Sequence, residues 1–180
     1  MSQQKSAAPV LIFTYGNPSR GDDALGPAMF DLLERKQKMA HTASPVELLT
    51  EYQLQIEHTI DLEQRECVLF IDASASCPSP YEFYKLQAEQ DDSYTTHAMS
   101  PAALLAVYQK INQREPPPSY MIAIRGYEFD LGQTITEQAM VNFRQSYEFI
   151  ETLLGTGSES WPEVCASGNN RPDRGANYEY

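Results

Sequence analysis

Two adjacent aspartates follow the first apolar run of the chain, inside a glycine-containing loop. The run Val10–Tyr15 ends at Gly16-Asn17-Pro18, and Asp22 and Asp23 come just before a segment with helical spacing. The loop has neither the Gly-Lys-Ser/Thr of a P-loop nor the G-x-G-x-x-G of a dinucleotide site. Carboxylates at this place suit a cation or a general base. Alternatively, they could serve only to stabilise the N-terminus of the following helix.

A third aspartate, Asp72, ends the apolar run Val68–Ile71. Ionised carboxylates are seldom left unpaired in such places because desolvation of the charge is costly. The first and third strands are neighbours in most α/β sheets, so we expect Asp72 to lie beside the loop that carries Asp23. A lone aspartate at a strand end is often only a turn former, but the two acids together favour a shared cation.

A histidine, His97, precedes the helix start Ser100-Pro101. The nine residues 88–96 span up to roughly 30 Å at ~3.3 Å each, enough to bring His97 to the same edge of the sheet. A lone loop histidine is more often ordinary than a ligand, and nothing around His41 or His58 indicates a site. Two carboxylates and an imidazole suit zinc, nickel, copper or iron, and the carboxylates extend the choice to manganese and magnesium.

Predicted strands and helices alternate along the chain around these residues. Strands are predicted at Val10–Tyr15, Val46–Thr50, Val68–Ile71, Tyr81–Leu86 and Tyr120–Ile124, and helices over residues 23–38, 54–64, 100–113 and 134–154, the last with a capping box from Thr134 to Glu137. The linker 73–80 is too short for a parallel crossover, so the fourth strand should be antiparallel. We expect a three-layer α/β fold with a mostly parallel five-stranded sheet, one antiparallel strand and helices on both faces. Its site should lie beyond the carboxyl ends of the strands.

The length, charge and cysteine content of the chain exclude some classes of partner and predict its compartment. The 180 residues fit one domain, predicted at 1–155, followed by a flexible tail at 156–180 that is rich in glycine, serine and asparagine. A net charge of −12 argues against nucleic-acid binding and against a basic membrane surface. The three cysteines, Cys67, Cys77 and Cys165, indicate reduced thiols without a zinc ribbon. The first apolar run is too short to span a bilayer, so we expect a cytoplasmic protein.

One alternative class is a phospho-acceptor receiver domain, which also has an acidic pair after its first strand and an aspartate at the end of its third. A receiver needs parallel crossovers throughout and a lysine after its fifth strand. Here the linker 73–80 is short, and Arg125-Gly126 follows the fifth strand. The receiver is therefore the weaker interpretation.

The loop from Gly16-Asn17 through Gly21-Asp22-Asp23 to Gly26, the strand that ends at Asp72, and Thr96-His97 ahead of a proline-capped helix occur in this order. The combination, over residues 10 to about 154, resembles the nickel–iron hydrogenase maturation endopeptidases. The resemblance implies removal of a C-terminal extension from the precursor of the hydrogenase large subunit. It also implies that Asp23, Asp72 and His97 are the metal-ligand and catalytic residues. Asp23 replaces a residue that is often glutamate in such proteins, one methylene longer.

The resemblance further implies that nickel is already held in the substrate precursor, so that the free enzyme carries no metal of its own. Pro18-Ser19-Arg20 is similar to the loop of maturation endopeptidases that serve NAD-linked, bidirectional hydrogenases. We expect a monomer whose partner is the large-subunit precursor. A binding module that checks the nickel of the precursor without cutting it is the second hypothesis, and the mass of the precursor's C-terminus separates the two.

Overall fold

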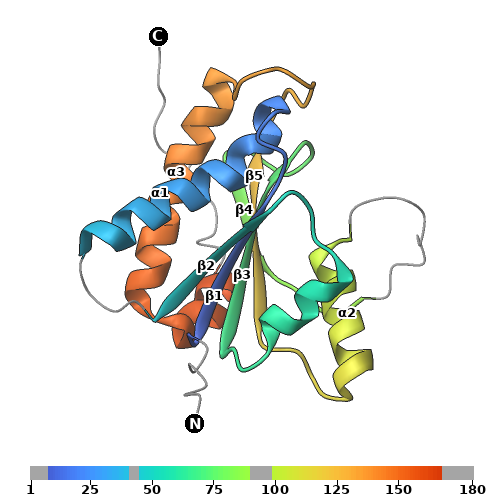
Figure 1. The fold of residues 1–180 in the computed structure, drawn as a ribbon. Coiled ribbons are helices and arrows are strands. Elements are labelled where there is room, and N and C mark those ends of the chain that lie inside the picture. Colours follow the sequence, from blue (N-terminus) through green and yellow to red (C-terminus); the bar gives the residue numbers. More distant parts are fainter. Residues whose placement is uncertain (1–7, 41–44, 90–98, 168–180) are drawn as a thin grey trace.

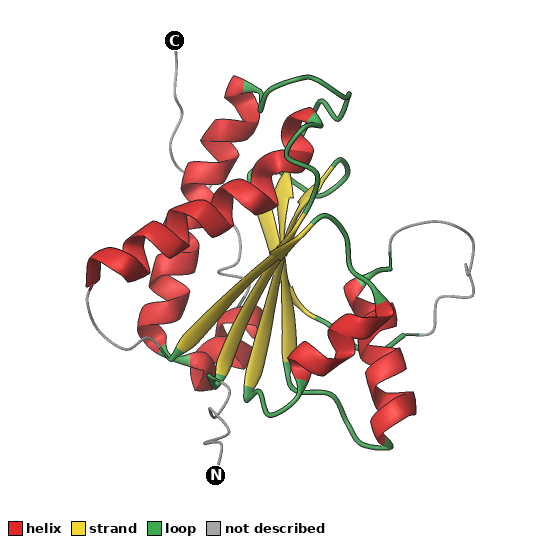
Figure 2. Cartoon of the chain, viewed as in Figure 1, coloured by secondary structure: helices red, strands yellow, loops and turns green. Residues whose placement is uncertain are grey.

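Five strands form one sheet in the computed structural model, which describes residues 8–40, 45–89 and 99–167 (Figures 1 and 2). The strands are β1 (Val10–Tyr15), β2 (Val46–Glu51), β3 (Cys67–Ser74), β4 (Tyr81–Lys85) and β5 (Ser119–Arg125). Their order across the sheet is β2-β1-β3-β5-β4. All neighbouring pairs are parallel except β4 and β5, so the expected antiparallel strand and the mostly parallel sheet are confirmed.

The strand order places a topological switch point between β1 and β3. From β1 the chain moves to β2 on one side, and it then returns across the sheet to β3 on the other side. Connections that leave in opposite directions open a crevice at the carboxyl ends of the two strands, where α/β proteins bind their ligands. The two strands pair in register, with Thr14 opposite Ile71.

The central strands are buried on both faces, as their continuous apolar runs predict. Ile12 points into one core, Leu11 and Phe13 point into the other, and the same alternation divides β3 and β5. The first core lies under α1 (Leu25–Ala40), α3 (Glu137–Thr156) and α4 (Trp161–Ala166). The second lies under α2 (Pro101–Asn112) and the 3₁₀ helix η2 (Ile56–Leu62). Figure 2 shows these helices on opposite faces of the sheet, which confirms the three layers.

Two predicted helix starts have different outcomes. Ser100 caps α2 as expected, since its hydroxyl accepts a hydrogen bond from the Ala103 N–H at 3.1 Å. The capping box at Thr134 is wrong, because α3 is capped two residues later by Thr136, whose hydroxyl accepts from the Ala139 N–H at 3.2 Å. The Thr136 hydroxyl also bonds to a buried carboxylate, and this tertiary contact selects it over the exposed Thr134.

The segment after α3 corrects the predicted flexible tail for residues 156–167. The short helices η3 (Ser158–Ser160) and α4 follow directly, and Trp161 is only 1% exposed. Its indole N–H donates to the Leu153 carbonyl at 3.0 Å, and its ring packs edge-on against Tyr120 of β5. A large aromatic side chain buried in the core therefore fixes this part of the chain, and residues 168–180 lie outside the described residues.

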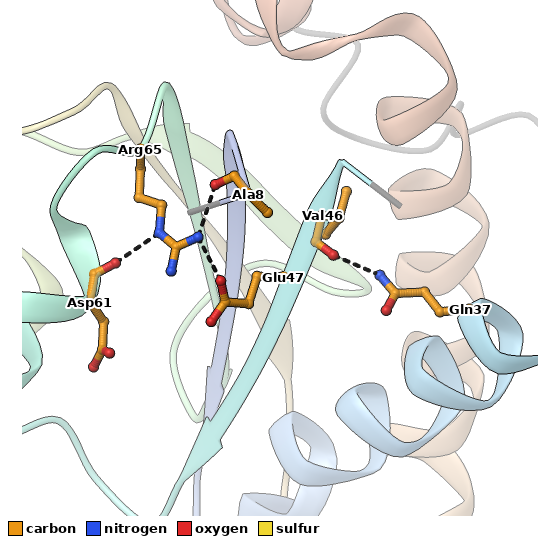
Figure 3. Close-up of polar contacts among 6 residues, drawn as sticks. All are labelled: Ala8, Gln37, Val46, Glu47, Asp61 and Arg65. Carbon is orange, nitrogen blue, oxygen red and sulfur yellow. Dashed lines mark hydrogen bonds and ion pairs between the residues drawn. The ribbon is translucent and has the colours of Figure 1, made fainter. Parts of the chain in front are cut away.

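The edge strand β2 is attached to its surroundings by polar contacts at its amino end (Figure 3). The Arg65 guanidinium donates to Glu47 at 2.7 Å, to the Ala8 carbonyl at 2.8 Å and to the Asp61 carbonyl at 2.9 Å. From the α1 side, the Gln37 amide donates to the Val46 carbonyl at 3.1 Å. These contacts hold the amino end of β2 against its neighbours, opposite to the edge at which the strands end.

Two smaller expectations concern the membrane and the cysteines. No helix in the described ranges has the length and apolar character needed to cross a bilayer. All three cysteines are free thiols, as expected, with Cys67 and Cys77 buried and Cys165 partly exposed on α4.

Candidate active site at the carboxyl edge of the sheet

The turn after β1 folds back onto the end of the strand. Gly16 has φ +141°, and a Cβ atom on it would lie 2.1 Å from the Asp23 carbonyl oxygen. A Cβ on Gly26 would lie 2.1 Å from the carbonyl oxygen of Tyr15. Only glycine permits these two close approaches, because any side chain would clash with backbone. The two glycines therefore fix Asp23 above the end of β1, which explains their places in the loop.

Asp23 presents a carboxylate with one protein donor. The Asn17 N–H donates to Asp23 Oδ2 at 2.9 Å, while the Asn17 side chain in turn accepts from the Ser19 N–H at 2.9 Å. Asp23 belongs to the 3₁₀ helix η1 (Gly21–Ala24), which precedes α1, and is partly exposed. Among the described residues, no other protein donor bonds to its carboxylate.

Asp22, its neighbour, has the opposite environment. It is fully buried and accepts four hydrogen bonds: from the N–H groups of Tyr127, Glu128 and Thr136 at 2.7–3.1 Å, and from the Thr136 hydroxyl at 3.0 Å. Burial alone would raise the pKa of Asp22, but these donors outweigh it and leave the pKa below its usual value. Asp22 thus ties η1 to the segment 126–136 and to the start of α3, and of the predicted acidic pair only Asp23 faces the edge.

Further backbone bonds join the loop after β1 to the segment 126–136, at the top of the view in Figure 1. The Gly21 N–H donates to the Gln133 carbonyl at 3.0 Å, and the Gly132 N–H donates to the Ser19 carbonyl at 2.7 Å. The Arg20 guanidinium donates to the Phe129 carbonyl at 3.2 Å. These hydrogen bonds hold the two segments together at the carboxyl edge of the sheet.

Asp72 lies near the carboxyl end of β3, close to the end of β1, as expected. Its Oδ1 accepts a hydrogen bond from the Ala73 N–H at 2.7 Å. Burial is the main cause that raises its pKa to about 8. The Ala73 N–H lowers the pKa, the charge of Asp23 raises it, and the nearby Tyr15 side chain lowers it again. Asp72 and Asp23 are therefore close enough to repel each other, and Asp72 binds a proton at neutral pH.

Tyr15 is a member of this site that the sequence analysis did not single out. Burial, followed by the nearby charge of Asp72, raises the pKa of its phenol well above the usual value. The phenol is therefore protonated at neutral pH. The signal in the sequence was the alternation of β1, which puts Tyr15 on the same face as Phe13 and opposite Asp72 on the adjacent strand.

His97, the third predicted site residue, lies outside the described residues, as does His41. Ser100, three residues after His97, caps α2, and α2 covers the face of the sheet on which Tyr15 lies. His58 is described and has a local role: its Nδ1 accepts from the Gln55 N–H at 2.9 Å, and its ring packs edge-on against Phe13. Among the described residues no three acidic, histidine or cysteine side chains form a metal-binding group, so the three-residue site stays a prediction.

The two carboxylates at this edge are suited to bind one divalent cation together. Two carboxylates from different elements face one edge, and one of them keeps a proton because a second negative charge and burial oppose its ionisation. A divalent cation between them would replace that proton and remove the repulsion. Oxygen donors of this kind accept hard and borderline cations.

Comparison with known proteins supports the fold. No protein-family model and no curated protein matches the sequence. Among solved structures, the [NiFe] hydrogenase maturation protease HycI of Thermococcus kodakarensis is similar with a TM-score of 0.61 and 17% identity, covering 84% of this chain and 95% of that one. The maturating endopeptidase HybD of E. coli gives a TM-score of 0.62 and 17% identity, with coverages of 82% and 93%.

A hydrogenase 2 maturation peptidase of a Thaumarchaeota archaeon is similar with a TM-score of 0.57 and 21% identity, covering 82% of this chain and 99% of that one. The chain therefore has the fold of the hydrogenase maturation proteases, and the match covers almost the whole length of those proteins. The receiver alternative is wrong, because β4 runs antiparallel to β5.

Proposed function

We propose that this protein is an endopeptidase that removes the C-terminal extension from the nickel-loaded precursor of a nickel–iron hydrogenase large subunit. The observation that carries the proposal is the pair Asp23 and Asp72 at the switch point of a fold shared with hydrogenase maturation proteases. Neither acid is neutralised by a basic side chain in the described hydrogen bonds and ion pairs. Such a pair is suited to a cation that arrives with a substrate.

In this proposal the nickel of the precursor is part of the substrate. Asp23 and Asp72, with His97, bind its exposed side and so bring the scissile peptide to the edge of the sheet. Nickel polarises the peptide carbonyl or a bound water, which is the chemistry a metal supplies in peptide hydrolysis. Asp72 gives up its proton as it binds, and Asp23 or Asp72 then serves as the base for the attacking water.

The cysteines support this reaction class over a thiol protease. Burial raises the pKa of Cys77, and burial raises the pKa of Cys67 to about 12. A thiol nucleophile needs a lowered pKa or an adjacent base. Cys165 lies on α4, on the side of the sheet opposite to the core that contains Tyr15.

The finer parts of the proposal follow from the sequence resemblance. The substrate is the precursor of an NAD-linked, bidirectional hydrogenase, and the enzyme acts in the cytoplasm as a monomer. To test the choice of substrate, the precursors of two hydrogenase classes are purified and their rates of processing are compared. Light scattering of the free protein tests whether it is a monomer.

The central experiment measures the mass of the precursor before and after incubation with the protein. Nickel-loaded precursor should lose its extension, whereas nickel-free precursor should stay intact. Asp23→Asn, Asp72→Asn and His97→Ala should each stay folded and lose processing, while the exposed Asp31→Asn on α1 should keep it. Cleavage of both precursor forms at equal rates would contradict recognition of nickel. Stable binding of the loaded precursor without any loss of mass would favour the non-cleaving binding module.

A further inference from the structure

Arg125 is the last residue of β5 and the only basic residue at which a parallel strand of the sheet ends. The other three parallel strands end at Tyr15, Glu51 and Ser74. β5 pairs in register with β3, so that Arg125 lies opposite Ser74. Arg125 is therefore at the same edge as the candidate site, on the strand next to the one that carries Asp72.

Arg125 and Asp72 belong to the same face of the sheet. Met121 and Ala123 of β5 face the core under α2, and so do Val68 and Phe70 of β3. By the two-residue alternation of strands, Arg125 and Asp72 continue these two rows. Asp72 lies opposite Ala123, so the Cα atoms of Asp72 and Arg125 are roughly 8 Å apart, one strand spacing across and two residues along. An extended peptide covers that span with about two or three residues.

The position of Arg125 is fixed by contacts on several sides. Its guanidinium donates to the Cys77 carbonyl at 3.2 Å, and the guanidinium carbon lies 5.3 Å from the centre of the Tyr127 ring. Its backbone N–H donates to the Pro80 carbonyl at 3.0 Å, and its own carbonyl accepts from the Asn142 side-chain amide at 2.9 Å. The side chain is half-buried. The guanidinium is thus held at the edge before any substrate arrives.

The charge of Arg125 is not neutralised by any described residue. A guanidinium has several N–H donors, and for Arg125 the bond to Cys77 is the only one to a described residue. The ion pairs of the described residues involve Lys36, Lys38 and Arg65 instead. The chain has 25 acidic and 13 basic residues, so acidic partners are abundant elsewhere on the protein. The charge of Arg125 is therefore free to attract an anionic group that reaches the edge.

The two flanks of the crevice carry opposite charges. Glu51 is the exposed last residue of β2, and β2 lies on the far side of β1 from β3 and β5. An anionic segment that leaves the crevice is repelled at the end of β2 and attracted at the end of β5. A guanidinium also matches a carboxylate in shape, since the two form parallel N–H···O bonds. The charges therefore direct a carboxylate-bearing peptide towards β5.

We propose that Arg125 is a specificity-determining residue that binds a carboxylate of the substrate's C-terminal extension, within about three residues of the cleaved bond. The identity of this substrate rests on the proposed function. Two sources supply the same chemistry, namely the α-carboxylate of the extension and an aspartate or glutamate side chain within it. Arg125 binds the extension and takes no part in the hydrolysis itself.

The test compares Arg125→Gln, Arg114→Gln and wild type in the full chain. Arg114 is a matched control, because its guanidinium carbon also lies over a tyrosine ring, 5.5 Å from the centre of Tyr108, but it is exposed and precedes the amino end of β5. Processing of nickel-loaded precursor is followed by mass. Arg125→Gln should raise KM about 10-fold and change kcat by less than about twofold, because it removes binding that substrate and transition state share. Arg114→Gln should match wild type. An unchanged KM in Arg125→Gln would overturn the inference.

Two altered precursors identify the carboxylate. In one the α-carboxylate is amidated, and in the other the aspartates and glutamates of the extension are replaced by asparagine and glutamine. The precursor that lacks the bound carboxylate should raise the KM of wild type about 10-fold and should leave the KM of Arg125→Gln unchanged. An equal rise in both proteins would show that Arg125 acts only through the fold, and would contradict the inference. Wild-type KM values that are the same for all precursors would also contradict it, even if Arg125→Gln failed to fold.

Binding of the extension alone separates this inference from the proposed function. A synthetic peptide of the extension is titrated into wild type and Arg125→Gln by calorimetry. Weaker binding to Arg125→Gln, together with no cleavage of the precursor by wild type, would support the carboxylate site and contradict the endopeptidase. Cleavage by wild type with an unchanged KM in Arg125→Gln would do the reverse. A wild type that neither binds the peptide nor cuts the precursor would contradict both.

Discussion

Asp22 and Asp72 are both enclosed by the protein near the carboxyl edge of the sheet, yet their surroundings differ in almost every respect. Asp22 is fully buried and receives four hydrogen bonds, all from the segment 126–136, and its pKa lies below the usual value. Asp72 receives a hydrogen bond from the Ala73 N–H, and it lies near the charge of Asp23. Its pKa is raised to about 8.

This contrast separates a structural carboxylate from a functional one. A buried charge with a full set of donors stabilises the fold, because each N–H that points at it would otherwise be unsatisfied. A buried carboxyl group with few donors is held in its neutral form and gains stability only when a cation arrives. The number and origin of the donors thus distinguish the two roles, while the residue type does not.

The largest expected effect is the loss of stability in Asp22→Ala. The substitution leaves three backbone N–H groups and one hydroxyl without their acceptor, and we expect unfolding free energy to fall by about 3–5 kcal/mol. Urea unfolding at neutral pH measures it, with Asp31→Ala on the exposed face of α1 as the matched control. A loss in Asp22→Ala no larger than in the control would contradict a structural role.

The next effect is a gain of stability in Asp72→Asn that grows with pH. The folded-state pKa of Asp72, about 8, exceeds the value of about 4 expected in the unfolded chain. The folded protein therefore binds the extra proton between these values, and its stability falls as pH rises through this window. Asparagine removes this fall, so the variant should be more stable than wild type by roughly 2–4 kcal/mol above about pH 8, and similar to it near pH 4.

Urea unfolding of both proteins across this pH range measures the difference. For Asp22 the pH dependence of stability has the opposite sign, because its pKa is lowered in the folded protein. Its contribution to the free energy of unfolding is fully present above the unfolded-state pKa and is lost as the pH falls toward the folded-state pKa. A stability difference between Asp72→Asn and wild type that does not change with pH would contradict the raised pKa. Processing should be lost in Asp72→Asn at every pH, since the cation loses a charged ligand.

The environments of these aspartates also show which features of the structure the sequence predicts and which it does not. The strand order, the antiparallel β4 and the approach of Asp72 to the loop after β1 follow from apolar runs and linker lengths, which are local properties. Asp22 and Asp23 are adjacent, and local pattern treats them alike. Their separation into a buried anchor and an edge residue depends on donors more than a hundred residues later in the chain, at Tyr127, Glu128 and Thr136.

The two wrong expectations have the same physical origin. Thr134 and Thr136 both suit a helix start, and the contact of Thr136 with Asp22 decides between them. The segment after α3 has the composition of a flexible tail, yet Trp161 anchors it against Tyr120 and Leu153. In each case one tertiary contact outweighs the local composition, and a single sequence shows no trace of that contact.

A smaller effect is expected for the hydroxyl that joins the Asp22 anchor to α3. Thr136→Val removes both the cap of α3 and one of the four bonds to Asp22, so unfolding free energy should fall by about 1–2 kcal/mol. Thr134→Val, at the position where the sequence predicted the cap, should change it by less than about 0.5 kcal/mol. Chemical unfolding of the two variants measures the difference, and equal losses would contradict the cap at Thr136.

The smallest effect tests the repulsion between the two edge carboxylates. Asp23→Asn removes the charge that helps to raise the pKa of Asp72, so the fall of stability with pH should end at a lower pH than in wild type. Above about pH 8 the variant should therefore be more stable by on the order of 0.5–1 kcal/mol, the usual size for partly exposed charges. The gain should disappear near pH 5, where Asp72 is neutral in the folded state, and also in the Asp72→Asn background, where no charge remains to be repelled. A double-mutant cycle measured by urea unfolding at these two pH values isolates the interaction. An equal gain in both backgrounds would mean that Asp23 affects stability through its own loop contacts and that the two carboxylates do not share one site.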